Sequence, residues 1–112
     1  MPVREIFHIT EPQVWQGAKD SGTFTESTRG RSLERVGYIH CSFGEQVAMV
    51  ANAIYEDYQG ELLLLAIDPA RVPSEIRVEN LEGVDEAFPH IYGVLPLDAV
   101  TAVHSMARRN NR

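Results

Sequence analysis

The strongest constraint on the fold is a run of six apolar residues, from Leu62 to Ile67, which Pro69 ends. A run of this length fits a β-strand, and its lack of alternation indicates that both faces of the strand are buried. Other elements must therefore cover this strand on each side. The run is also much shorter than the ~20 apolar residues that a membrane-spanning helix needs.

Shorter patterns on both sides of this strand predict an α+β domain. A length of 112 residues fits a single domain. The expected strands are 3–10, 37–41, 61–68, 76–79 and 101–106, the main helices are 10–20 and 42–57, and short helical turns are expected at 32–36 and 96–100. We expect residues 1–107 to form one domain, with residues 108–112 as a frayed basic tail.

Both main helices are expected to begin with a capping box. Gln13 follows Thr10 by three residues, and Glu45 follows Ser42 by three residues. In such a box the hydroxyl accepts a hydrogen bond from a free backbone amide, and the later side chain reaches back to the cap. Helix capping is therefore the simplest role for Thr10 and Ser42. Ligand binding through the same hydroxyls is the alternative.

A histidine precedes each of these hydroxyl residues by two positions. The two segments are residues 7–10, FHIT, and residues 39–42, IHCS. Strand alternation places His8 on the same face as Thr10, and His40 on the same face as Ser42. Each histidine would then lie near a helix N-terminus, which attracts anions and disfavours a protonated imidazole. The layout predicts neutral histidines that donate a hydrogen bond to a hydroxyl or phosphate oxygen.

A third histidine, His90, lies in the unusual segment PHIYG at residues 89–93. We interpret His8, His40 and His90 together as candidate catalytic residues of one shared pocket. Tyr38 shares a face with His40 and Tyr92 is close to His90, so both tyrosines are candidates for stacking on a ligand.

Three other roles remain open at this stage. Each histidine on its own is more typical of a hydrogen-bonded structural residue. Three histidines can also form a zinc site with an open position, but no two of them have the close spacing of a metal motif, and we predict no metal. Cys41 should face the core rather than act as a nucleophile. No phosphate-binding glycine loop of the Walker or Rossmann kind occurs.

The charge distribution limits the class of partner. The net charge is −6, and Arg108, Arg109 and Arg112 lie at the C-terminal end, so residues 1–107 carry 7 basic and 16 acidic side chains. An acidic body argues against broad nucleic-acid binding. Arg29, Arg31 and Arg35 form either a small anion clamp or a solvated loop. A single cysteine and the lack of a visible secretory signal lead us to expect a cytoplasmic protein without membrane association.

Two motifs closely resemble a small bacterial family. They are GYIHCS at residues 37–42 and FPHIYG at residues 88–93, the latter followed by LPLDAV at residues 95–100. The segment IFHIT at residues 6–10, Trp15, Gln46 and the leucine-rich strand fit as well. This family is domain-of-unknown-function family 952 (DUF952), and the resemblance covers about residues 4–104. Val94 departs from the family pattern, which has a proline there.

The family looks like a remote member of the ADP-ribosyltransferase-like fold. The resemblance implies a split, mainly antiparallel β core with two main helices that binds NAD or an ADP-ribose-type ligand. In such enzymes a histidine on the first strand holds a ribose hydroxyl, and His8 matches it. The pair His40 and Ser42 is similar to a histidine-plus-hydroxyl motif of RNA 2′-phosphotransferases, and His90 would complete the pocket. The glutamate that many of these transferases use cannot be placed.

The leading hypothesis is a domain that binds a nucleotide or ADP-ribose-type ligand, and whose chemistry would be that of a transferase. His8, His40 and His90 are its candidate catalytic residues. Thr10, Tyr38, Ser42 and Tyr92 are its candidate ligand-binding residues. The alternative is a non-enzymatic module that binds a small anion or a partner, in which the histidines are structural. Neither hypothesis specifies the oligomeric state.

Overall fold

The predicted leucine-rich strand is β5, Gly60–Ile67, and it lies inside a four-stranded antiparallel sheet. The computed structural model describes residues 4–27, 31–81 and 85–108. The sheet has the order β4-β1-β5-β9 and includes β1, Ile6–Thr10, and β9, Val100–Arg108. Its remaining strand, β4, is Ser42–Phe43. The prediction of a strand covered on both sides is confirmed, because the two faces of β5 contribute to two separate hydrophobic clusters.

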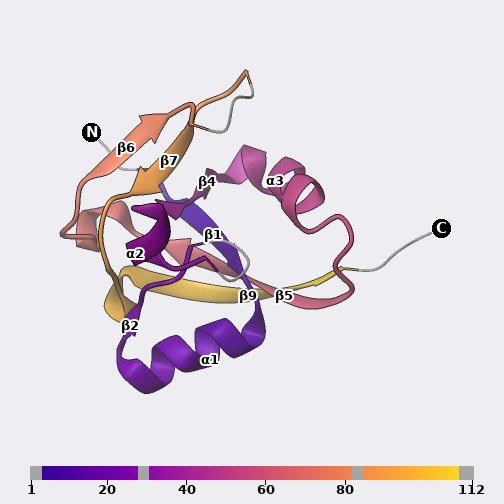
Figure 1. The fold of residues 1–112 in the computed structure, drawn as a ribbon, viewed down its shortest axis with the longest axis horizontal. Helices are drawn as coiled ribbons and strands as arrows, with labels where there is room; N and C mark the ends of the chain where they lie inside the picture. Colours follow the sequence, from indigo (N-terminus) through magenta and orange to yellow (C-terminus); the bar gives the residue numbers. More distant parts are fainter. Residues whose placement is uncertain (1–3, 28–30, 82–84, 109–112) are drawn as a thin grey trace.

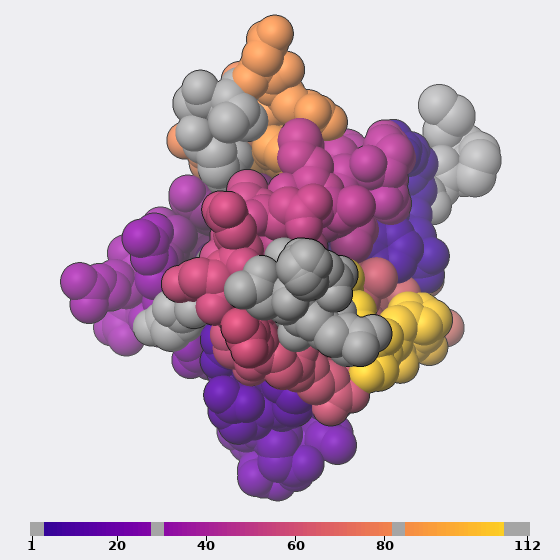
Figure 2. All heavy atoms as spheres, turned by 90° about the vertical axis from the view of Figure 1, so that its right-hand side faces the viewer, coloured from indigo at the N-terminus to yellow at the C-terminus, as the bar shows by residue number. Residues whose placement is uncertain are grey.

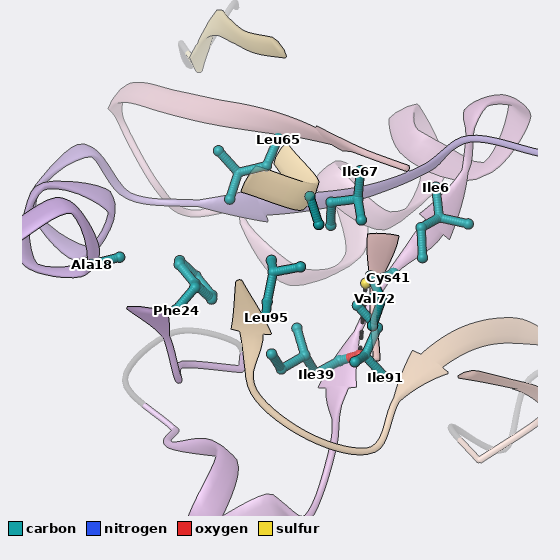
Figure 3. Packing of buried hydrophobic residues seen from close by; sticks show 11 residues of the cluster. Ile6, Ala18, Phe24, Ile39, Cys41, Leu65, Ile67, Val72, Ile91 and Leu95 are labelled. Atoms are coloured by element: carbon teal, nitrogen blue, oxygen red, sulfur yellow. Dashed lines mark hydrogen bonds between the residues drawn. The ribbon is translucent and has the colours of Figure 1, made fainter. Parts of the chain in front are cut away.

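The two clusters fill opposite sides of the four-stranded sheet. Leu65 and Ile67 belong to the first cluster, which Ala18 of α1, Pro12–Ser21, joins. Leu62 belongs to the second cluster, which includes Val50 and Ala51 of α3, Val47–Ile54. Figure 3 shows how side chains from several elements, among them Leu65 and Leu95, gather in the first cluster. Burial of this apolar surface supplies the main stabilisation of the fold.

The β core is split into separate sheets (Figure 1). A three-stranded antiparallel sheet has the order β3-β7-β6, and a short two-stranded sheet pairs β2 with β8. The bounds of these strands are Ile39–His40 for β3, Ile76–Glu79 for β6, Phe88–Ile91 for β7, Thr23–Phe24 for β2 and Leu95–Pro96 for β8. The predicted α+β class with mainly antiparallel strands is confirmed.

The helices are close to their expected positions. They are α1, Pro12–Ser21, α2, Leu33–Val36, and α3, Val47–Ile54, with 3-10 turns at Gly44–Gln46, Pro69–Arg71 and Leu97–Ala99. Gly22 has a φ of 96° and ends α1 after Ser21, one residue beyond the predicted end at residue 20. Helix α3 ends three residues earlier than the predicted Asp57, because Tyr55 leaves the helical conformation and is buried in the second cluster.

Both predicted capping boxes are wrong. Glu11, not Thr10, is the N-cap of α1, and Thr10 is the last residue of β1. Ser42 belongs to β4, and the following turn begins one residue later, after Phe43. At both positions the residue is part of a β-strand, so it does not take the N-cap position of the following helix. The hydroxyls of Thr10 and Ser42 are therefore not used as helix caps.

In the described ranges, no helix is long and apolar enough to span a lipid bilayer. The expected tail, residues 108–112, begins one residue too early, since Arg108 is the last residue of β9. The rest of the expected tail, residues 109–112, lies outside the described residues.

Candidate functional site

The candidate site lies where strand β4 leaves strand β1. β4 pairs with only two residues of β1, Ile6 and Phe7, whereas β5 pairs with all five on the other side. Before β4, the chain passes through Cys41 from β3, which belongs to the three-stranded sheet. His8 is therefore the first residue of β1 that extends beyond its short partner.

The ring of His8 occupies this split between the sheets. Its Nδ1 lies 2.6 Å from the carbonyl oxygen of His40. A carbonyl only accepts hydrogen bonds, so Nδ1 carries the proton and donates it. In the neutral ring this leaves a lone pair on Nε2. That atom is buried, and no other described residue forms a hydrogen bond with it.

Burial keeps this imidazole neutral. The pKa of His8 falls from its ordinary value of 6.5 to about 4, mainly because the ring is removed from water. The nearby His40 lowers the pKa further, while the backbone groups of His40 and Ser27 act in the opposite direction. At neutral pH, Nε2 of His8 is consequently a hydrogen-bond acceptor or a base.

A small recess adjoins this histidine. His8, His40 and Ser42 line it together with Ile9, and its facing wall consists of Val50, Ile54 and Tyr55. It encloses about 220 Å³, partly open to solvent, but its enclosed part holds about one water molecule. The recess therefore admits one hydroxyl-sized group, and any larger part of a ligand must lie outside it.

His40 and His90 face each other across the second sheet. They are direct partners in the pairing of β3 with β7, and their ring centroids are 5.4 Å apart in an edge-to-face arrangement. His90 is completely buried and does not line the recess. The structure thus places His40 between the other two histidines, in contact with each. The recess is faced by α3 and by Tyr55, which follows it, and neither His90 nor Tyr92 lines it.

The two candidate tyrosines lie on the far side of His90. The ring centroid of Tyr38 is 4.9 Å from that of His90 and 5.8 Å from that of Tyr92. The hydroxyl of Tyr92 donates to Glu79 over 2.5 Å, and this bond raises the pKa of Tyr92. The guanidinium of Arg77 lies 4.7 Å above the Tyr92 ring. These contacts make Tyr92 part of the β6–β7 surface, apart from the recess.

The other candidate residues are placed as follows. Thr10 is buried at the end of β1 outside the recess. Cys41 is in the first hydrophobic cluster, as predicted, and burial strongly raises the pKa of its thiol. Arg31 and Arg35 are exposed, and Arg29 lies outside the described residues. Where the structure describes the chain, no three His, Cys, Asp or Glu side chains are placed to hold a metal ion.

A buried glutamine near the recess has a structural role that sequence reasoning missed. Oε1 of Gln46 accepts from the Phe43 amide over 2.9 Å, and its Nε2 donates to a carboxylate oxygen of Glu86 and to the Ala87 carbonyl over 2.8 and 2.9 Å. Gln46 therefore links the turn after β4 to the segment that enters β7. The two acceptors of its Nε2 are 40 and 41 residues away, so no local pattern reveals them.

Gln46→Glu should lower the free energy of unfolding by about 2 kcal/mol at neutral pH. The substitution preserves the shape and the acceptor for Phe43, but it removes both donated bonds and places a second carboxylate against Glu86. Urea unfolding measures the effect. Gln16→Glu is a matched control, because Gln16 also donates to a carboxylate, that of Asp20, but is exposed on α1. It should cost well under ~1 kcal/mol, and an equal loss in both variants would contradict the assignment.

The chain is similar to one family and one protein of known structure. Residues 9–103 match the family described as "Protein of unknown function (DUF952)". The crystal structure of protein CC0527 from Caulobacter crescentus has a TM-score of 0.72 and 28% identity, covering 90% of this chain and 84% of that chain. The solution NMR structure of CC0527 has a TM-score of 0.72 and 26% identity, covering 92% and 84%. No curated protein matches the sequence.

Proposed function

The chain belongs to the DUF952 family, described as of unknown function, and we propose that it binds a small molecule of the nucleotide or ADP-ribose type at the recess beside His8. One ribose hydroxyl of the ligand enters the recess and donates a hydrogen bond to Nε2 of His8. His40 and Ser42 lie at the same recess and complete the contact with the sugar.

One observation carries this proposal: the lone pair on Nε2 of His8. A buried polar atom without a partner costs about 1–3 kcal/mol, so its presence in a core calls for a reason. The recess that His8 lines accommodates one hydroxyl group and no more. An O–H donor on a ligand satisfies this acceptor. The resemblance to ADP-ribosyltransferase-like proteins, in which a first-strand histidine holds a ribose hydroxyl, supports a ribose as the source of the donor.

The geometry supports binding better than glutamate-dependent transfer. Among the described residues, no carboxylate lines the recess. Glu79 is held by Tyr92 and flanked by Arg77 on the β6–β7 surface. A neutral His8 supplies a base at Nε2 for a hydroxyl bound there. A transferase step would therefore rely on this imidazole and on groups of the ligand.

A specific observation also favours the second candidate function, a non-enzymatic module with structural histidines. The Nδ1 bond of His8 to the His40 carbonyl connects β1 to the strand that diverges from it. The edge-to-face pair of His40 and His90 contributes in the same way to the second sheet. In this reading the histidines hold the split together, and a water molecule occupies the recess.

His8→Asn separates the two candidates. The side-chain amide of asparagine occupies the position of Nδ1 and can still donate to the His40 carbonyl, but nothing replaces Nε2. We expect the variant to remain folded at neutral pH and to bind ligand roughly tenfold more weakly, as befits the loss of one buried hydrogen bond. Calorimetric titration with NAD, ADP-ribose and a 2′-phosphorylated ribose measures the affinity.

Two controls make this test specific. His104→Asn is the same substitution at an exposed histidine of β9 and should leave affinity unchanged. NAD analogues that lack one ribose hydroxyl identify the group that enters the recess, since only one of them should lose affinity. If the wild-type protein binds none of the three ligands, or if His8→Asn binds them equally well, the histidines are structural.

A further inference from the structure

We propose that His8 makes the recess selective for a free ligand hydroxyl, so that the nucleotide bound there is unphosphorylated at the ribose oxygen that enters. This inference rests on the function proposed above and narrows its substrate class. Its basis is the direction of one hydrogen bond, because an Nε2 that only accepts binds different chemical groups from an Nε2 that donates.

The single proton of the neutral His8 ring is used inside the protein. Nδ1 lies 2.6 Å from the His40 carbonyl oxygen, and a carbonyl oxygen accepts but cannot donate. The proton is thereby held on Nδ1, and Nε2 has only a lone pair. The sequence predicts a histidine that donates to a hydroxyl or phosphate oxygen. At His8 the structure shows the opposite polarity, because the His40 carbonyl already accepts the proton.

The carbonyl that fixes this proton is itself held in place. The amide of the same peptide group, that of Cys41, donates to the Pro89 carbonyl over 2.9 Å. His40 also pairs with His90 in the three-stranded sheet. The carbonyl oxygen cannot turn away from His8 without breaking the bond to Pro89, since both atoms belong to one planar peptide group. Nε2 of His8 therefore remains an acceptor while a ligand binds.

An acceptor at this position discriminates between groups of similar size. A hydroxyl donates its proton to Nε2. Fluorine and a methoxy group bring only lone pairs, and a phosphate ester is mostly a dianion at neutral pH. With any of these, two acceptors would face each other without a proton between them. In a buried environment water does not screen the resulting repulsion.

The other residues of the recess do not compensate an anion. No lysine or arginine is among the described residues that line it. The hydroxyl of Ser42 both donates and accepts, so it fits a ligand hydroxyl without selecting it. Room for about one water molecule also excludes a phosphate by size. Helix α3, which carries Val50 and Ile54, lies at the surface of the molecule (Figure 2), so a phosphate elsewhere on the ligand can remain in water.

Matched ligands test this selection by calorimetric titration at neutral pH. The parent is NAD or ADP-ribose, whichever binds more tightly, and in its analogues one ribose hydroxyl at a time is replaced by hydrogen or by fluorine. At one position both replacements should weaken binding at least about tenfold, and fluorine should be no better than hydrogen. Fluorine is close to a hydroxyl in size but cannot donate. A phosphate on that same oxygen should abolish measurable binding.

Two variants assign the selection to His8. His8→Asn keeps a donor for the His40 carbonyl but has no Nε2, so it should bind the parent and the fluorine analogue with equal affinity. His104→Asn, the same change at an exposed residue of β9, should keep the full preference for the hydroxyl. Circular dichroism checks that both variants are folded.

The possible failures are distinguishable. If neither parent binds, or if no hydrogen analogue loses affinity, both the function proposed above and this selectivity are wrong. If the hydrogen analogue binds weakly but the fluorine or phosphate analogue binds as tightly as the parent, only the selectivity is wrong. A preference for the hydroxyl that persists in His8→Asn also overturns it, because another residue then makes the distinction.

Discussion

Gly93→Ala should lower the free energy of unfolding by about 3 kcal/mol, which is near the upper end for forcing one methyl group into packed structure. A Cβ at Gly93 would lie 1.9 Å from Oγ and 2.6 Å from Cβ of Ser74. Rotation moves the hydroxyl away, but the Cβ of Ser74 is fixed to the backbone. The two segments are also tied together, because the Tyr92 amide donates to the Glu75 carbonyl over 2.9 Å. Urea unfolding at neutral pH measures the loss.

A second substitution should recover most of this stability. Ser74→Gly removes the obstructing Cβ, and the nearest remaining atom of residue 74 is its Cα, at an ordinary distance of 3.9 Å. The double variant should therefore be clearly more stable than Gly93→Ala alone. Gly17→Ala is the matched control, since α1 has open space there and alanine favours a helix by about 1 kcal/mol. A stable Gly93→Ala protein would show that the segments can separate without cost.

Acid should destabilise the protein through His8 by about 3 kcal/mol between pH 6.5 and pH 4. The pKa of His8 is about 4 in the folded protein and 6.5 as its ordinary value. Between these values the unfolded chain binds a proton that the folded chain excludes. The contribution of His8 is thus fully present above pH 6.5, is lost as the pH falls, and changes no further below about pH 4.

The measurement compares the wild-type protein with His8→Asn over this range of pH. Carboxylates contribute equally to both curves, so the difference between the curves isolates His8. The two proteins should have similar stability at pH 7, and the wild type should become the less stable by the stated amount near pH 4. If the unfolding free energies of the two proteins change in parallel with pH, the imidazole of His8 is not kept neutral by burial.

The sequence predicts those parts of the fold that depend on local pattern. The leucine-rich run identifies β5 and its burial on both faces, and Gly22 identifies the end of α1. The two-residue strands β2 and β8 have no periodicity to detect, because their pairing joins segments about 70 residues apart. The true end of α3 depends on burial of Tyr55, which is a tertiary effect.

The candidate site is predictable only in part for the same reason. The repeated histidine layout identifies His8 and His40 but treats them as equivalent. The structure makes them different, because β4 is too short to cover His8 and the His40 carbonyl then accepts from its ring. Tyr55 at the recess and Gln46 beside it could not be inferred, since their roles depend on contacts between distant segments.

The strand order also determines when the fold can form during synthesis. Of these strands, β1 is synthesised first, yet its longest pairing is with β5. Ile6 cannot pair until its partner Ile67 has been synthesised. Likewise, His40 cannot pair with His90 until fifty further residues have been synthesised. Contacts of such long separation slow folding. The nascent chain therefore carries an exposed β1 until β5 has emerged and an unformed split until β7 has emerged, and the sheet is complete only when β9 follows.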